Sequence, residues 1–148
     1  MIKTKEQAKN YEEWAPIPCE LTYGRPTKNG NVLPTTVEAT LNMDVETLEF
    51  VFCDEKSFEL LRVGPEDVEV LEITRVGLFA PKTEILAVTK MEDDGSTLTF
   101  QARKIANRYR AMLTNMVDYF VDGLYFRRGN IWIRDEVAFE EYQNEIDE

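Results

Sequence analysis

The chain has 148 residues, no histidine, and a formal net charge of −11 that results from 28 acidic and 17 basic side chains. Apolar residues make up 43% and charged residues 30%, which argues against a disordered chain and against a membrane protein. The absence of histidine excludes His-based catalytic triads and His-ligated metal sites. Because this length is typical of one domain, we expect residues 1–148 to form a single domain with its own core.

The sequence also leads to expectations about the cellular location and the two cysteines. The segment from Met1 to Ala8 lacks the apolar stretch of a signal peptide, and no apolar run is long enough to cross a membrane. We therefore expect a cytoplasmic location without membrane association. In that reducing compartment Cys19 and Cys53 are expected to be buried free thiols. Two cysteines without histidine do not complete a usual zinc site, so we expect no metal and no cofactor.

The first half of the chain has the patterns of one helix followed by strands. Thr4 and Gln7 form a capping-box pattern, which predicts a short helix over residues 4–14. Alternating apolar and polar residues then predict antiparallel strands with one solvated face, joined first by a turn at Asn29-Gly30. Residues 54–61 are expected to form a short helical excursion. The alternating apolar positions are Ile17, Cys19, Leu21, Tyr23; Val37, Ala39, Leu41, Met43; and Leu48, Phe50, Phe52.

The second half is expected to contain further strands and the longest helix. Residues 84–91 and 97–100 predict a hairpin, and apolar residues at spacings of three and four then predict an amphipathic helix of about five turns from Ala102 to Phe120. Gly123 is expected to end this helix. Residues 124–126 and 131–133 flank Arg127-Arg128-Gly129-Asn130 and predict a hairpin, and Asp135 is the expected N-cap of a last helix.

These elements predict an α+β fold in one domain. We expect an antiparallel sheet of about five or six strands plus a C-terminal hairpin. The sheet would pack on one long amphipathic helix, with short helices at the N-terminus and the C-terminus.

Basic residues are concentrated in one part of this acidic chain. Residues 101–134 contain 7 basic and 2 acidic side chains, whereas residues 135–148 contain 7 acidic side chains and no basic one. Cations in the first half of a helix oppose the helix dipole, so acids of the protein itself, an external anion or an acidic partner must compensate them. The basic region and its neighbours form a candidate anion-binding site: Arg103, Lys104, Asn107, Arg108, Arg110, Arg127 and Arg128.

Acidic residues occupy the polar positions of the predicted strands. Because alternate residues of a strand project from the same face, these carboxylates could form an ordered array. The array could simply be a solvated face that keeps the protein soluble, or it could dock on a basic partner and mimic nucleic-acid phosphates. The candidate partner-binding residues are Glu20, Glu38, Glu49 and Glu69.

Signatures of catalysis are largely absent. The sequence contains no P-loop, no G-x-G-x-x-G fingerprint, no G-x-S-x-G elbow and no C-x-x-C pair. Asp118 and Asp122 are four residues apart and could hold Mg²⁺ only with help from further oxygen ligands. We therefore expect a protein that is not an enzyme.

Two hypotheses about function remain. The first is a non-catalytic acidic interaction protein, an inhibitor or adaptor that engages a basic, nucleic-acid-binding protein, as a phage-type anti-defence protein acting by charge mimicry would. The alternative is a small-ligand binder that captures an anionic, nucleotide-like molecule over the Arg103–Arg110 surface. The net charge disfavours general nucleic-acid binding, because the molecule would repel phosphates at long range. Both hypotheses are compatible with a homo-oligomer.

Overall fold

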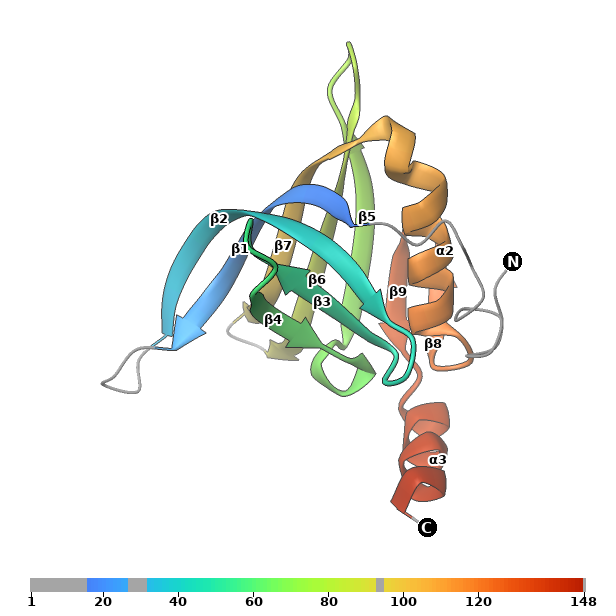
Figure 1. Cartoon of the computed structure of the whole chain (residues 1–148). Helices are drawn as coiled ribbons and strands as arrows, with labels where there is room; N and C mark the ends of the chain where they lie inside the picture. The colour runs from blue at the N-terminus through green and yellow to red at the C-terminus, as the bar shows by residue number, and fades with distance from the viewer. Residues whose placement is uncertain (1–15, 27–31, 93–94, 148) are drawn as a thin grey trace.

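A computed structural model describes residues 16–26, 32–92 and 95–147, and within them nine antiparallel strands form one curled sheet (Figure 1). The strand order is β4-β3-β2-β1-β7-β6-β5-β9-β8. The strands are β1 (Ile17–Pro26), β2 (Val32–Asp44), β3 (Glu49–Cys53), β4 (Glu59–Val63), β5 (Val70–Val76), β6 (Lys82–Glu92), β7 (Gly95–Ala106), β8 (Tyr125–Arg128) and β9 (Ile131–Arg134).

Four helical segments complete the described part of the chain. Two are single 3-10 turns, η1 (Pro65–Asp67) and η2 (Asn107–Tyr109), and two are α-helices, α2 (Arg110–Val121) and α3 (Glu136–Asp147). Helix α2 packs along the open side of the curl, whereas α3 extends away from the sheet (Figure 1). None of these helices is long and apolar enough to cross a membrane.

The core lies between the inner face of the sheet and α2. The alternating residues of β1 supply it as predicted, and Ile17 and Leu21 are fully buried. Phe120 of α2 stacks on Phe50 of β3 with ring centroids 4.4 Å apart. Cys19 is buried, and burial raises the pKa of its thiol to about 12, whereas Cys53 is only half-buried; both are free.

The predicted helix from Ala102 to Phe120 is wrong. Residues 102–106 belong to β7, and the α-helix begins only at Arg110. Lys104 has a φ of 60°, and the pairing with β6 shifts register here, so Ala102 and Ile105 both point into the core. This irregularity places two inward residues three positions apart, which is the spacing that also predicts a helix.

The predicted sheet of five or six strands is also wrong. Residues 54–61 form a turn and the start of β4 instead of a helix, because the Asp54 carboxylate accepts hydrogen bonds from the backbone N–H groups of Lys56 and Phe58, both at 2.9 Å. The sheet curls around α2 and reaches nine strands, with the C-terminal hairpin joined to it through β5 and β9.

Other local predictions are confirmed. The strands pair in antiparallel fashion, β8 and β9 form the C-terminal hairpin, and the Asp135 carboxylate caps α3 by accepting from the N–H groups of Val137 and Ala138, both at 3.2 Å. The predicted helix over residues 4–14 and the Asn29-Gly30 turn lie outside the described residues.

Candidate ligand-binding pocket

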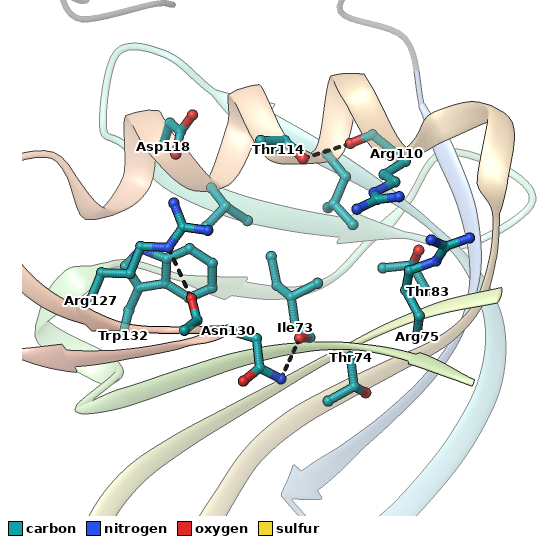
Figure 2. A pocket seen from close by; sticks show the side chains of 13 residues that line it. Ile73, Thr74, Arg75, Thr83, Arg110, Thr114, Asp118, Arg127, Asn130 and Trp132 are labelled. Carbon is teal, nitrogen blue, oxygen red and sulfur yellow. Dashed lines mark hydrogen bonds between the residues drawn. The ribbon is translucent and has the colours of Figure 1, made fainter. Parts of the chain in front are cut away.

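The main candidate site is a cavity of about 860 Å³ between α2 and the inner face of the sheet around β5 and β9 (Figure 2). Its middle is apolar and its two ends are polar. Ile73 of β5 and, on the opposite wall, Leu113 and Val117 of α2 line the middle, and side chains of β5, β6, α2 and the β8–β9 hairpin form the ends.

One end of the pocket contains two arginines and a buried hydroxyl. Arg75 follows Leu71 and Ile73 on the inner face of β5, Thr83 precedes Ile85 on the inner face of β6, and Arg110 is the first residue of α2. These three side chains lie together on the right of Figure 2.

The polar groups at this end have no ion-pair or side-chain hydrogen-bond partner among the described residues. Neither Arg75 nor Arg110 forms an ion pair within the described part of the chain. Thr83 is only 2% exposed, and its hydroxyl oxygen makes no hydrogen bond to any described residue. Buried polar groups in folded proteins are nearly always satisfied, so this hydroxyl requires an explanation, and an ordered water or a bound group is one.

The opposite end combines a cation, an aromatic ring and two hydrogen-bonding groups. The Arg127 guanidinium lies 5.1 Å from the centre of the Trp132 ring and donates a hydrogen bond to the Gly129 carbonyl at 2.9 Å. The Asn130 amide donates to the Ile73 carbonyl at 2.9 Å, which leaves its own carbonyl oxygen available as an acceptor.

Asp118 of α2 also lines this end of the pocket (Figure 2). Burial raises the pKa of its carboxyl, and the nearby Arg127 charge opposes that rise. The pocket therefore holds three arginines and one carboxylate, an excess of positive charge in a chain of net charge −11.

The predicted basic region is divided among different surfaces. Arg110 and Arg127 line the pocket, but Arg103 pairs with Glu84 at 3.0 Å on β6. Lys104 pairs with Glu20 at 2.9 Å. Asn107 and Arg108 are exposed on η2, Arg108 lies over its neighbour Tyr109, and Arg128 is exposed on β8. The residues separate because Arg103 and Lys104 belong to a strand and not to the first half of a helix.

The predicted acidic residues are mostly neutralised by cations of the same chain. Besides the Glu20 pair, Glu49 lies 3.2 Å from Arg62, and Glu69 lies 3.1 Å from Arg134. Glu38 is exposed and lies directly opposite Glu20 in the register of β1 and β2. The four carboxylates do not form the uniform anionic array that their spacing suggested.

Several pocket residues were missed by the sequence analysis. Arg75, Thr83, Asn130 and Trp132 were not among the candidate residues, because none of them belongs to a recognisable binding motif. One feature of the sequence could have indicated two of them. Arg75 and Thr83 occupy positions that alternate with buried apolar residues of their strands, so a polar side chain is expected to point inward there. Asp122 follows the end of α2, is exposed and does not line the pocket, although its charge contributes to the raised pKa of Asp118. No group of three metal-ligating side chains occurs among residues 16–26, 32–92 and 95–147.

Comparisons with protein-family models, with curated proteins and with solved structures found no match for this chain. The class of site is therefore defined by the pocket itself: a partly apolar cavity with a few convergent polar groups, as in small-molecule sites.

A separate charge network on the outer side of the sheet leads to a pH prediction. Arg62 contacts Asp44 at 2.7 Å, Glu59 at 2.8 Å and Glu49 at 3.2 Å. The hydrogen bond from Arg62 lowers the pKa of Asp44 below its ordinary value of 3.8. Because the folded-state pKa is the lower one, this stabilisation is present above about pH 4 and is lost as the pH falls through the folded-state pKa.

We expect the Arg62→Gln variant to be less stable than the wild type by roughly 1 kcal/mol near pH 7, since the pairs are partly exposed. The difference should shrink as the pH is lowered from 6 to 3. Urea unfolding of both proteins across this range checks the prediction, with Arg108→Gln as a control that removes an exposed arginine outside the network. A difference that grows toward pH 3 would contradict it.

Proposed function

We propose that the protein is a non-catalytic binding protein that captures a small anionic, nucleotide-like molecule in the pocket between α2 and strands β5 and β9. The observation that carries the proposal is the arrangement at one end of the pocket. There Arg75 and Arg110, without ion-pair partners in the described chain, flank the unsatisfied hydroxyl of Thr83.

This end has the chemistry that binds phosphate. Guanidinium groups bind phosphate oxygens through paired, charge-assisted hydrogen bonds, and a hydroxyl supplies one more donor. Arg110 also begins α2, so the positive end of the helix dipole lies at the same place. An anionic group here would compensate two arginines that have no ion-pair partner among the described residues.

The other end supports a ligand that is more than a bare anion. Asp118 and Asn130 offer oxygen acceptors, and Trp132 and Arg127 offer planar groups beside the apolar middle of the pocket. Such groups suit a polar ring that donates hydrogen bonds, as nucleobases and riboses do. The distribution of charge along the pocket therefore favours a molecule with one anionic end and one polar, planar end.

The first test is thermal shift of the intact chain with three sets of compounds: nucleotides, the matching nucleosides, and inorganic phosphate. A ligand that binds only the native state stabilises it by about 2.7 kcal/mol at 100 times its Kd, so binding raises the melting temperature. We expect a shift with at least one nucleotide that exceeds the shifts with its nucleoside and with phosphate. No shift with any nucleotide at millimolar concentration would contradict the proposal.

Thr83→Val separates ligand binding from folding at the same position. Valine has the shape of threonine but lacks the hydroxyl, and removing an unsatisfied buried hydroxyl should leave the unliganded protein equally or more stable. We expect ligand affinity to fall by roughly 3- to 10-fold, which corresponds to the loss of one hydrogen bond. Melting curves with and without ligand measure both effects. A variant that is clearly less stable without ligand would show that the hydroxyl has a structural role instead.

The acidic-interaction hypothesis is a second candidate, favoured by α3. This helix extends away from the sheet (Figure 1), has an acidic first turn and no basic residue, and exposes Glu140, Glu141 and Glu145. A basic partner could dock there and on Glu38, where no ion pair occurs among the described residues. Capture from a nuclease-treated lysate at low salt, followed by graded salt elution, tests this hypothesis. Recovery of no basic protein would count against it.

A further inference from the structure

The outer face of the sheet, which is turned away from α2, carries an uninterrupted apolar row. The register places Val88 of β6 beside Val70 of β5, and Ile133 of β9 between Val70 and Phe126 of β8. Leu98 of β7 extends the row beyond Val88. These five side chains, one from each of five neighbouring strands, are named the outer apolar row.

Three side chains of this row are accessible to a partner, whereas Val88 is buried and Val70 is half-buried. Leu98, Ile133 and Phe126 are 42%, 40% and 59% exposed, and a hollow of about 540 Å³ lies over the middle of the row. The row crosses five strands at a spacing of about 4.8 Å, so it is roughly 19 Å long. The outer face of an antiparallel sheet is ordinarily polar, and a contiguous exposed apolar patch marks an interaction site.

Beside the outer apolar row runs a second row that contains opposite charges. Glu72 of β5 pairs in register with Ile131 of β9, and Ile131 pairs with Arg128 of β8. Glu72 and Arg128 are therefore two strands apart, about 10 Å, with Ile131 midway between them. Neither forms an ion pair within the described part of the chain.

We propose that this face is a two-fold interface with a second copy of the chain. Consider a two-fold axis that lies in the plane of the interface, runs parallel to β9 and passes over Ile131. This axis places Glu72 of each copy opposite Arg128 of the other. The same axis places Phe126 of each copy over Val70 of the other and the two Ile133 side chains over each other, in the manner of two packed sheets about 10 Å apart, whereas Val88 and Leu98 lie beyond the partner's edge strand β8. Glu72 and Arg128 have opposite charges and lie at equal distances from Ile131, so this face is complementary to a copy of itself turned by 180°. A closed isologous dimer requires such self-complementarity.

The proposal does not depend on the ligand pocket, because the pocket lies on the inner face of the sheet. Sedimentation equilibrium of the full chain over micromolar to millimolar concentrations is the first measurement. We expect a mass that rises to twice the chain mass of 17.2 kDa. A single-chain mass over the whole range overturns the proposal, including the case in which this face binds a different protein.

Charge reversal identifies the interface. Glu72→Arg leaves two arginines on each face and Arg128→Glu leaves two glutamates, so each variant alone should lose the dimer through repulsion of like charges. When the two variants are mixed, a chain that presents only arginines meets a chain that presents only glutamates. Opposite charges then face each other on both sides of the axis, and a mixed dimer should form.

Native mass spectrometry with one variant isotopically labelled distinguishes the mixed dimer from the two homodimers. Circular dichroism confirms that each variant is folded, and Phe126→Asp serves as a second disrupting variant at an exposed position. Glu38→Arg is the matched control: it makes the same charge change at an exposed position on β2 and should leave the dimer intact. Single variants that remain dimeric, or folded variants that do not associate when mixed, overturn the assignment of this face.

Discussion

Replacing Arg75 and Arg110 together by alanine is expected to abolish the ligand-induced rise in melting temperature without lowering the stability of the unliganded protein. Both arginines line the pocket, and neither has an ion-pair partner among the described residues to lose. A hydrogen bond to a charged group contributes about 1.5–3 kcal/mol, so each single variant should bind roughly 10- to 100-fold more weakly. Isothermal titration with the ligand found in the thermal-shift screen measures the loss.

The matched control for these variants is Arg103→Ala. Arg103 belongs to the same basic stretch of sequence but pairs with Glu84, away from the pocket. Its removal should leave ligand affinity unchanged. An equal loss with Arg103→Ala would show that the overall basic charge, and not the pocket, attracts the ligand.

The largest effect on stability is expected from Phe120→Ala. Phe120 is fully buried, stacks on Phe50 at 4.4 Å and lies 6.1 Å from the ring of Tyr125, so it joins α2 to both halves of the sheet. Truncation of a buried phenylalanine costs about 3–5 kcal/mol, because apolar contacts are lost and a cavity remains. Unfolding in denaturant should show this loss as a lower midpoint.

Phe79→Ala is the control for that variant. Phe79 is 93% exposed in the β5–β6 connection, so the same change in side chain should alter stability by less than about 0.5 kcal/mol. If the two variants were equally stable, Phe120 would not have the central position in the core that the structure shows.

Predictions from the sequence succeeded where the structure of a segment was determined by interactions within that segment. Alternation along β1 identified its inward residues, Asp135 was recognised as a helix cap, and the β8–β9 hairpin was located from its turn. The prediction failed at Lys104, where one residue with positive φ changed the phase of β7. The spacing of Ala102 and Ile105 then fitted a helix equally well, and periodicity alone does not distinguish these cases.

The pocket was only partly foreseeable for a related reason. Arg110 and Arg127 were candidates because basic residues are dense in their part of the sequence. Arg75 and Thr83 come from the separate hairpin β5–β6, and Trp132 meets them only because β9 pairs with β5. No local pattern specifies which strands become neighbours in the sheet when they are far apart in the sequence.

The sequence by itself determined the properties that are summed over residues or confined to a few neighbours: the absence of histidine, the net charge of −11, the antiparallel alternation and the helix cap. Only the tertiary structure decided which charges would neutralise one another and which would remain available. Lys104 and Glu20 met because β1 and β7 are adjacent, whereas Arg75 and Arg110 were placed together with no acid of the described residues between them. The interaction of two charges depends on their distance and burial, and strand order sets both.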